Sequence, residues 1–392
     1  MPHTSWSIIE TRGRAGLEQL EADWRRLYAE MPLRTSFLAY EASLAFVDRL
    51  LATPDRLRCV ALTDGRQVRA ICLLEPRTDR MLGPQIRVWG VLRLRHGRQA
   101  HVICPDDQAR RELIPALVTH LQRNPEGRPL LFLGPLPVSS TLWDGLRQLG
   151  RGEYCVDPRE SVWLFDCTKP FDELISGLSR KRRRNLRNAQ NRLAALEDVR
   201  FVTAREAADL ETEFATFLDV EASGWKGETG TRSALRFRGQ QPLFFGDLAA
   251  NMRGDVDHCE INALYAEGRC LASLFCTRTG ATYSALKIGI DEAYGRVSPG
   301  QLLLANTLEH CCQDPGIERL DMVSDAAWLQ SWRPDAVALQ TAYVALARWP
   351  GRPIVGLLRF RFGHARRLVR WLRGKRAAIG REDVGRDSAR FT

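Results

Sequence analysis

The feature that most constrains the fold of this chain is an internal repeat in its order of expected strands and helices. Residues 7–11 read as a strand, and apolar side chains then recur every three or four positions from 17 to 27, as on one face of a helix. The same order returns at 199–202, where a strand precedes a helix with apolar positions between 210 and 218. Both copies therefore open as a strand followed by a helix.

The repeat continues into a hairpin, further strand and a second helix in each copy. Asp64-Gly65 and Glu267-Gly268 have the composition of tight turns, and each lies between two strand-like runs. After each hairpin the pattern predicts a helix and a short apolar strand, at 108–123 and 130–133 and again at 300–313 and 317–320. The two turns lie about 200 residues apart, and a gene duplication explains the matching order better than chance does.

This order of elements predicts an α/β chain, more strictly α+β, in which each copy forms a mixed, mostly antiparallel sheet flanked by helices. Such a sheet opens at one point, and ligands favour the splayed carboxyl ends of its strands. Gly, Pro and charged residues gather at 150–158, so we expect domains at 1–155 and 156–376. Residues 377–392 are polar and charged, which predicts a disordered tail.

Composition narrows the class of partner without choosing one. The 392 residues carry a formal net charge of +10, which favours an anionic partner such as a nucleotide cofactor, RNA or an acidic membrane. No basic and apolar leader opens the sequence and no run of about 18 apolar residues occurs, so we expect a cytoplasmic protein. Residues 360–373 mix basic and apolar side chains at helical spacing, which fits either a peripheral membrane contact or a helix docked on the second domain.

The ten cysteines lack the paired spacing of a zinc site or of a disulfide framework. In a reducing compartment such thiols act as small buried hydrophobic residues. His310, Cys311 and Cys312 are adjacent, but neighbouring residues on a helix point about 100° apart, which makes chelation from one helix awkward. We therefore expect no metal.

The stretch 283–304 of the second copy carries the clearest sign of chemistry. A strand runs into a loop with small residues, and an apolar helix starts directly after it. Small residues let the backbone approach a pyrophosphate, and the amide groups and dipole at a helix start favour negative charge. The predicted phosphate-binding residues are Gly295, Arg296, Ser298, Gly300 and Gln301. The alternative is a plain strand-to-helix turn punctuated by proline and glycine.

The corresponding loop of the first copy, 103–108, indicates a difference between the two copies. It contains no glycine and places Asp106 and Asp107 at the helix start. These carboxylates complement the helix dipole themselves and would repel a phosphate. We therefore expect the first copy to be a structural half without a donor site.

Ordered pieces of the second copy carry a family resemblance. They are a basic helix at 178–187, the run 221–227, Lys287 with 291–294, the run 298–300, and a looser piece at 320–322. From about residue 174 to 334 the chain resembles the CelD-like branch of the GNAT acyltransferases, associated with cellulose and exopolysaccharide gene clusters and similar to the Fem-type peptidyltransferases. The resemblance implies two tandem GNAT-like domains, and transfer of an acetyl or longer acyl group from a CoA or acyl carrier protein thioester. The implied acceptor is an amine of a small molecule, a sugar or a cell-envelope precursor.

That chemistry needs a base for the acceptor ammonium, backbone donors for the thioester carbonyl, and contacts that hold the acceptor. The predicted bases are Asp321 and Glu221, and Tyr283 is predicted to protonate the departing thiolate. The predicted substrate-binding residues are Trp225, Lys226, Lys287 and Asp291. The alternatives are ordinary surface carboxylates, a packed tyrosine and a solvated loop lysine.

The basic run 180–184, with Arg187 and Arg192, wraps too many faces of a helix to form one stripe, so part of it is solvated. The remainder would form an electrostatic collar for the donor phosphates or for RNA. Two further functions stay open: aminoacyl-tRNA-dependent transfer of the Fem type, and a catalytically inactive scaffold of a polysaccharide synthesis complex. The sequence has no long heptad run for the coiled-coil arm of many Fem proteins, which disfavours the Fem-type function and with it a nucleic-acid partner. Retention of 298–300 argues against the scaffold.

Overall fold

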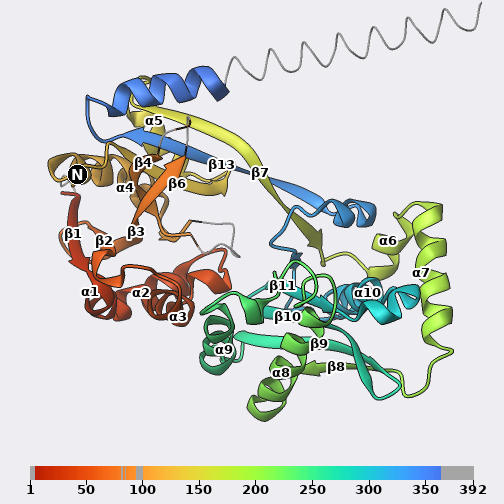
Figure 1. The fold of residues 1–392 in the computed structure, drawn as a ribbon. Helices are drawn as coiled ribbons and strands as arrows, with labels where there is room; N and C mark the ends of the chain where they lie inside the picture. The colour runs from red at the N-terminus through yellow and green to blue at the C-terminus, as the bar shows by residue number, and fades with distance from the viewer. Residues whose placement is uncertain (1–4, 81–82, 84, 94–99, 363–392) are drawn as a thin grey trace, which may run out of the picture.

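The computed structural model describes residues 5–80, 83, 85–93 and 100–362, which Figure 1 shows as two halves lying side by side. The strands of the first half are β1 (Ser7–Arg12), β2 (Arg58–Thr63), β3 (Val68–Arg80), β4 (Gln85–Val91), β5 (Val102–Ile103) and β6 (Leu130–Pro137). Its helices are α1 (Gly13–Gln19), α2 (Glu21–Glu30), η1 (Ser36–Leu38), α3 (Tyr40–Arg49), η2 (Pro54–Arg56), α4 (Asp107–Arg123) and α5 (Leu142–Gln148), where η marks a 3-10 helix.

The second half repeats this order. Its strands are β7 (Tyr154–Asp166), β8 (Arg200–Ala204), β9 (Asp257–Ala266), β10 (Arg269–Thr279), β11 (Thr282–Ile290), β12 (Arg319–Asp321) and β13 (Asp335–Ala345). Its helices are α6 (Phe171–Ser176), α7 (Arg180–Leu193), α8 (Ala207–Ser223), η3 (Leu235–Phe237), α9 (Gln241–Asn251), η4 (Glu292–Val297), α10 (Pro299–Gln313) and η5 (Ala327–Trp332). Residues 351–362 are also helical.

The strands form one sheet whose order is β1-β2-β3-β4-β6-β13-β7-β12-β11-β10-β9-β8, with β5 paired to β3. The order β1-β2-β3-β4-β6 from one end mirrors β8-β9-β10-β11-β12 from the other. In each half one parallel pair, β4 with β6 or β11 with β12, is joined by a helix, α4 or α10, while the hairpins are antiparallel. The mixed, mostly antiparallel sheet and the duplicated order are therefore confirmed.

The two long strands at the centre, β7 and β13, belong to both halves. β13 pairs with β6 through residues 339–345, and along its whole length it pairs antiparallel with β7. The far end of β7, at 164–166, then pairs with β12. Figure 1 shows both strands running from one half to the other. The boundary expected at 150–158 overlaps the start of β7, and the division into domains at 155 stays a prediction.

The halves also share an apolar core on one face of the sheet. This cluster contains Trp24 and Phe46 from α2 and α3 together with Phe245 and Phe275 from α9 and β10. Figure 1 shows α1, α2 and α3 on the same side of the molecule as α8 and α9. Separating the two halves would therefore expose large aromatic side chains as well as break the central strand pairs.

Other sequence-based expectations have a mixed outcome. All ten cysteines are free and all but Cys270 and Cys312 are buried, as expected for thiols that act as small apolar residues. Within the described part of the chain, no helix has both the length and the apolar character needed to cross a bilayer. The tail 377–392, and the amphipathic segment 360–373 from residue 363 onward, lie outside the described residues.

Candidate functional site

The sheet opens between β11 and β12, as the mixed topology predicts. These parallel strands pair only at residues 282–284 and 319–321, because β12 ends at Asp321. β11 continues to Ile290 with β10 on its other side, so within the described part of the chain its edge from 285 to 290 has no strand partner. An unpaired strand edge presents backbone N–H and C=O groups that need partners.

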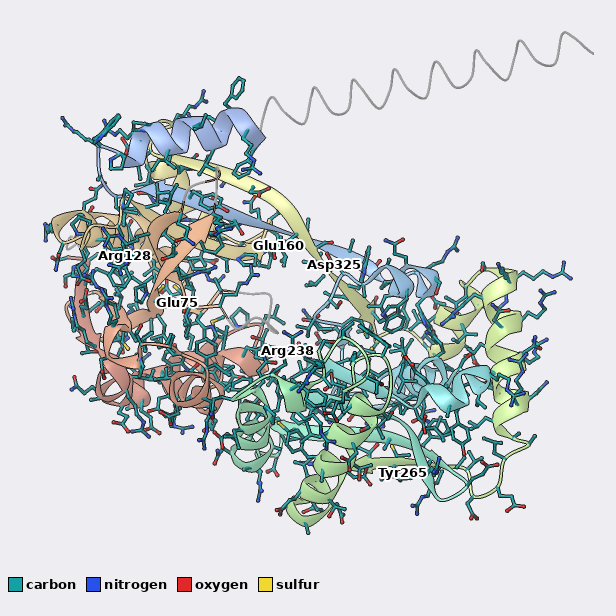
Figure 2. The ribbon with its side chains drawn as sticks, in the orientation of Figure 1. Glu75, Arg128, Glu160, Arg238, Tyr265 and Asp325 are labelled. Carbon is teal, nitrogen blue, oxygen red and sulfur yellow. The ribbon has the colours of Figure 1, made fainter. Side chains whose placement is uncertain are left out.

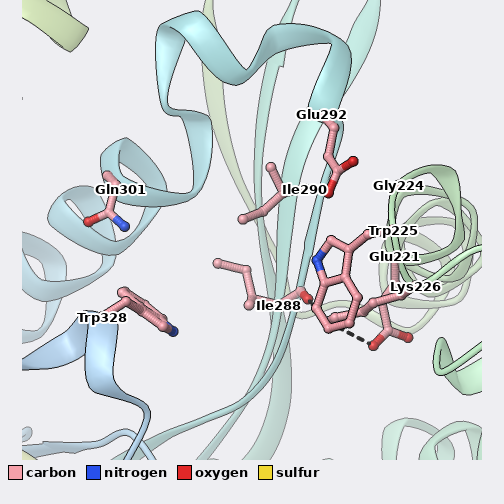
Figure 3. A pocket seen from close by; sticks show the side chains of 9 residues that line it. All are labelled: Glu221, Gly224, Trp225, Lys226, Ile288, Ile290, Glu292, Gln301 and Trp328. Atoms are coloured by element: carbon pink, nitrogen blue, oxygen red, sulfur yellow. Dashed lines mark hydrogen bonds and ion pairs between the residues drawn. The ribbon is translucent and has the colours of Figure 1, made fainter. Parts of the chain in front are cut away.

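Two adjoining cavities lie along this free edge. The larger, about 360 Å³, has Ile288 and Ile290 between a wall from α10 and a wall from the end of α8, as Figure 3 shows. It is lined by Glu221, Gly224, Trp225, Lys226, Ile288, Ile290, Glu292, Gln301 and Trp328. The smaller, about 170 Å³, shares Lys226, Ile288 and Trp328 with it and reaches Lys287 and Met322. Together these cavities form the candidate site, which lies in the gap between the two parting strands.

The α10 wall is held close to β11 by a glycine. A Cβ on Gly300 would lie 2.5 Å from Cδ1 of Ile290, well inside ordinary contact. The missing side chain of Gly300 therefore serves helix–strand packing. Its neighbour Gln301 lines the cavity and accepts a hydrogen bond at Oε1 from Nε1 of Trp332 at 2.8 Å, and another from Arg182.

The start of α10 is free of a side-chain cap. Ser298, the N-cap, has a left-handed backbone (φ 56°) and makes no capping hydrogen bond, and Pro299 has no N–H. Gly295 and Arg296 are exposed on the preceding η4 turn, and Arg192 donates to the carbonyl oxygen of Arg296 at 2.7 Å. The predicted phosphate-binding residues thus surround an uncapped helix start beside the cavity.

The equivalent helix start in the first half is already occupied by a carboxylate. Oδ1 of Asp106 accepts hydrogen bonds from the backbone N–H groups of Gln108 at 2.6 Å and Ala109 at 2.9 Å. These donors are the ones that an anionic ligand would otherwise use. The difference between α4 and α10 is therefore the one expected from the loop 103–108.

The α8 wall is built around a buried carboxylate. Glu221 is 3% exposed, and its Oε2 accepts from the N–H of Leu235 at 2.7 Å. Its Oε1 lies 3.3 Å from Nζ of Lys226, which also donates to the carbonyl oxygen of Ile288 at 2.9 Å. Lys226 thereby ties the wall to the free edge of β11. Trp225 is 58% exposed, and its ring centroid lies 5.9 Å from Nζ of Lys226 (Figure 3).

A bulge in β11 displaces the backbone next to Lys287. Phe275 of β10 pairs with Lys287 and Cys276 pairs with Ala285, which leaves Leu286 without a partner across the hairpin. Lys287 lines the smaller cavity, and its ammonium group makes no hydrogen bond or ion pair to any described residue. Burial lowers its pKa, Glu221 opposes this effect, and the nearby charges of Lys226 and Arg238 add to it.

Three of the predicted catalytic and acceptor-binding residues lie outside the linings of both cavities. Tyr283 is fully buried, donates to Oε2 of Glu260 at 2.7 Å and accepts from Asn262 at 2.7 Å, and burial raises its pKa well above the ordinary value. Asp291 caps the η4 turn by accepting from the N–H of Ala293 at 3.0 Å. Asp321 lies at the end of β12. Tyr283 is thus surrounded by packed protein where a thiolate has no access, and its catalytic role stays a prediction.

Asp321 lies where the two strands part, at the end of β12. Its side chain is 8% exposed and accepts a hydrogen bond from the N–H of Val323 at 2.7 Å. Burial raises its pKa to about 6. Of the predicted site residues the structure therefore gathers Glu221, Trp225, Lys226, Lys287 and Gln301 at the cavities, with the loop 295–300 beside them.

Five residues that line the larger cavity were not among the predicted site residues: Gly224, Ile288, Ile290, Glu292 and Trp328. Ile288 and Ile290 read only as an ordinary strand, Glu292 as a turn residue, and Trp328 as an unremarked aromatic side chain. Trp328 is 41% exposed and faces the cavity from η5, opposite Trp225 (Figure 3). A tryptophan in a polar segment was the one signal that could have indicated it.

The basic helix α7 is divided between structural and exposed residues. Arg182 donates to Gln301 and lies 4.4 Å from the ring centroid of Trp332, while Arg183 donates to two backbone carbonyls at the start of the helix. Arg184 and Arg187 are exposed. The helix runs beside the loop 292–300, so its exposed cations lie near the uncapped start of α10.

The fold and this opening define a class of protein. Residues 180–328 match the acetyltransferase (GNAT) domain family, so the second half contains a GNAT-type domain and the chain is an acyltransferase by class. In the described part of the chain, no group of three or more His, Cys, Asp or Glu side chains is arranged to hold a metal ion. None of the curated proteins matches the chain in sequence.

Solved structures share the fold at low sequence identity. FemX aligns with a TM-score of 0.54 at 11% identity, over 86% of this chain and 98% of that chain. A conserved protein of unknown function from Bacteroides thetaiotaomicron VPI-5482 aligns with a TM-score of 0.54 at 11% identity, over 83% and 97%. The C-terminal domain (DUF2156) of a putative lysylphosphatidylglycerol synthetase from Agrobacterium fabrum aligns with a TM-score of 0.51 at 10% identity, over 89% and 97%. These likenesses concern the fold alone.

Proposed function

We propose that the chain is an N-acyltransferase with a single active site at the opening between β11 and β12. The observation that carries this proposal is the free edge of β11 beside two cavities and an uncapped helix start. A bound acyl-CoA or acyl carrier protein thioester would supply the activated acyl group. The acyl length, acetyl or longer, and the choice between these donors belong to the proposal.

The donor arm would lie along residues 285–290 of β11. An extended ligand with amide groups can pair with an unpaired strand edge much as another strand does. Its phosphates would lie at the start of α10, where the N–H of Gly300 and the helix dipole favour negative charge and no side-chain cap competes. Gly295, Arg296, Ser298, Gly300 and Gln301 are the proposed phosphate contacts.

The exposed residues of α7 would add long-range attraction for those phosphates. Arg184 and Arg187 are exposed, and no ion pair neutralises either of them among the described residues. Cations near an anion site raise its association rate in a salt-dependent way. Because Arg182 and Arg183 are engaged in the fold, we assign the collar to the exposed residues only.

The acceptor amine would approach from the α8 wall. Glu221 is the predicted base that lines the cavity, although its two oxygens already contact Lys226 and Leu235. Lys287, which has no hydrogen bond or ion pair to a described residue, lines the smaller cavity together with Lys226. We propose that Trp225, Lys226 and Lys287 contact the acceptor, while Asp321 and Tyr283 affect the site only through the packing around it.

Titration calorimetry with acetyl-CoA tests the donor site. Gln301→Glu keeps an acceptor for Arg182 and Trp332 but adds a carboxylate at the start of α10, and we expect roughly tenfold weaker binding from the added repulsion. Gln108→Glu is the matched control at the start of α4, where we expect no change. Failure of the wild-type protein to bind acetyl-CoA, or equal effects of the two substitutions, would contradict the proposal.

The wider assignments are proposals of the same kind. An amine of a small molecule, a sugar or a cell-envelope precursor remains the expected acceptor, and the CelD-like branch the expected relationship. The likeness in fold to FemX leaves aminoacyl-tRNA-dependent transfer as the second candidate. Binding of acetyl-CoA by the wild-type protein would favour thioester-dependent N-acyl transfer, because a tRNA-dependent enzyme needs no CoA site.

A further inference from the structure

A third cavity lies between the two halves, on their concave junction. Its volume is about 600 Å³, within the usual range for small-molecule sites. The first half lines it with the end of α3, with β3 and with Arg93; the second half lines it with the segment 238–241. Figure 2 places Arg238 and Glu160 near this junction.

The lining is rich in arginine. Among the described lining residues are four arginines, Arg49, Arg77, Arg93 and Arg238, and one carboxylate, that of Glu75. They come from four separate segments of both halves, so only the folded chain brings them together. Such a set of planar donors matches the oxygens of a phosphate group better than those of an uncharged ligand.

Three of the four guanidinium groups are held in place by carboxylates. Arg49 contacts Asp247 at 2.7 Å and Arg93 contacts Glu160 at 3.2 Å, and both carboxylates lie outside the cavity lining. Arg77 lies 3.9 Å from Glu75 and 4.7 Å from the ring centroid of Phe132. Each guanidinium has five N–H donors, so these contacts orient the group and leave donors over.

Arg238 differs from the others and connects this cavity with the candidate site. Its side chain is exposed, and among the described residues its one hydrogen bond is a 3.4 Å contact from Nε to the carbonyl oxygen of Ser233. Arg238 lies three residues after Leu235, whose N–H donates to Oε2 of Glu221 at 2.7 Å in the α8 wall of the larger cavity. A ligand seated among the arginines would therefore extend toward the opening of the sheet from the α8 side.

We propose that this cavity binds the acceptor through a phosphate group on the acceptor and so presents its amine to the free edge of β11. The proposal rests on the function proposed above and adds the chemical class of the substrate, a phosphorylated amine. The arginines are binding residues, and the acyl transfer itself takes place at β11. In this arrangement the first half, which has no donor site of its own, contributes the acceptor site.

Calorimetric titration with inorganic pyrophosphate, in the presence of saturating CoA to occupy the donor site, tests this assignment. We expect the wild-type protein to bind pyrophosphate and the double variant Arg77→Gln/Arg238→Gln to bind it at least about tenfold more weakly. The control Arg236→Gln removes an exposed arginine near Arg238 that pairs with Asp219 outside the cavity, and should change nothing. Malonate, a carboxylate dianion, should bind more weakly than pyrophosphate.

The outcomes separate this inference from the donor site. Equal pyrophosphate affinity in the wild-type protein and the double variant, no binding at all, or equal affinity for malonate would overturn it. Should Arg77→Gln disturb the packing against Phe132, the single variant Arg238→Gln decides, because Arg238 is exposed and bears little of the fold. Failure of the wild-type protein to bind CoA would instead overturn the proposed donor site. Arginine-dependent binding of pyrophosphate would in that case still support the phosphate-binding cavity.

Discussion

Replacing Asp321 with asparagine should stabilise the fold at neutral pH. The carboxyl group is 8% exposed and has one hydrogen bond, from the N–H of Val323 at 2.7 Å, which an asparagine oxygen can also accept. Burial raises its pKa from 3.8 to about 6, because the charged form loses its hydration. A shift of this size corresponds to an ionisation cost on the order of 3 kcal/mol above pH 6.

The sign of the pH dependence follows from proton binding. Between about pH 4 and pH 6 the folded state holds a proton on Asp321 that the unfolded state has lost. The contribution of this group to stability therefore falls as pH rises through that window and is level above it. Asp321→Asn removes the ionisation, so its gain over the wild-type protein should be small near pH 4 and largest above pH 6.

Urea unfolding at pH 4.5 and pH 7.5 measures this difference. Asp335→Asn is the control, because Asp335 is exposed at the start of β13. Turnover of acetyl-CoA with an amine, followed by release of free thiol, should proceed in Asp321→Asn at the wild-type rate, because we propose that Asp321 acts only through packing. Loss of a general base lowers the rate by about 10²- to 10⁴-fold even in a stabilised protein. A loss of stability at pH 7.5, or an equal change at both pH values, would refute the reasoning.

Three further predictions concern the walls of the site and the junction of the halves. Gly300→Ala should weaken acetyl-CoA binding, because the added Cβ would lie 2.5 Å from Cδ1 of Ile290. Adding Ile290→Val, which removes this Cδ1 atom, should restore much of the affinity. Lys226→Met should destabilise the fold by about 1–3 kcal/mol in urea unfolding, because it leaves the buried Glu221 carboxylate without its cation, and adding Glu221→Gln should recover part of this loss. Limited proteolysis within 150–153 should yield two fragments that elute together on gel filtration, and their separation would show that β13 and the shared core do not hold the halves.

Much of the fold could be predicted because it depends on local patterns. The hairpin turn Asp64-Gly65 has its glycine at φ 85°, and Gly268 in the second hairpin is at φ 69°, backbone conformations that glycine adopts without steric cost. The helices α4 and α10 begin within a residue of the positions expected from their apolar spacing. Asp106 caps α4 as a carboxylate at a helix start should.

The candidate site was only partly predictable. Trp225, Lys226, Lys287 and Gln301 do line the cavities, since a loop after a helix and a strand that enters a phosphate-type turn were visible as patterns. Tyr283 and Lys287 lie four residues apart on β11, so in a regular strand their side chains would point to the same face. The bulge at Leu286 shifts the alternation of side chains between the two residues, and no spacing rule revealed it.

The sequence by itself determined that this chain folds as a duplicated α+β unit with different helix starts in its two copies, because turns, caps and apolar periods act over a few residues. Only the tertiary structure decided that β7 and β13 pair with each other at the centre of the sheet, that Gly300 serves packing, and that arginines from four segments meet in one cavity. These features depend on pairings between residues up to about 200 positions apart. Contacts between distant residues form only after the intervening chain has closed into a loop, so local sequence patterns do not reveal them.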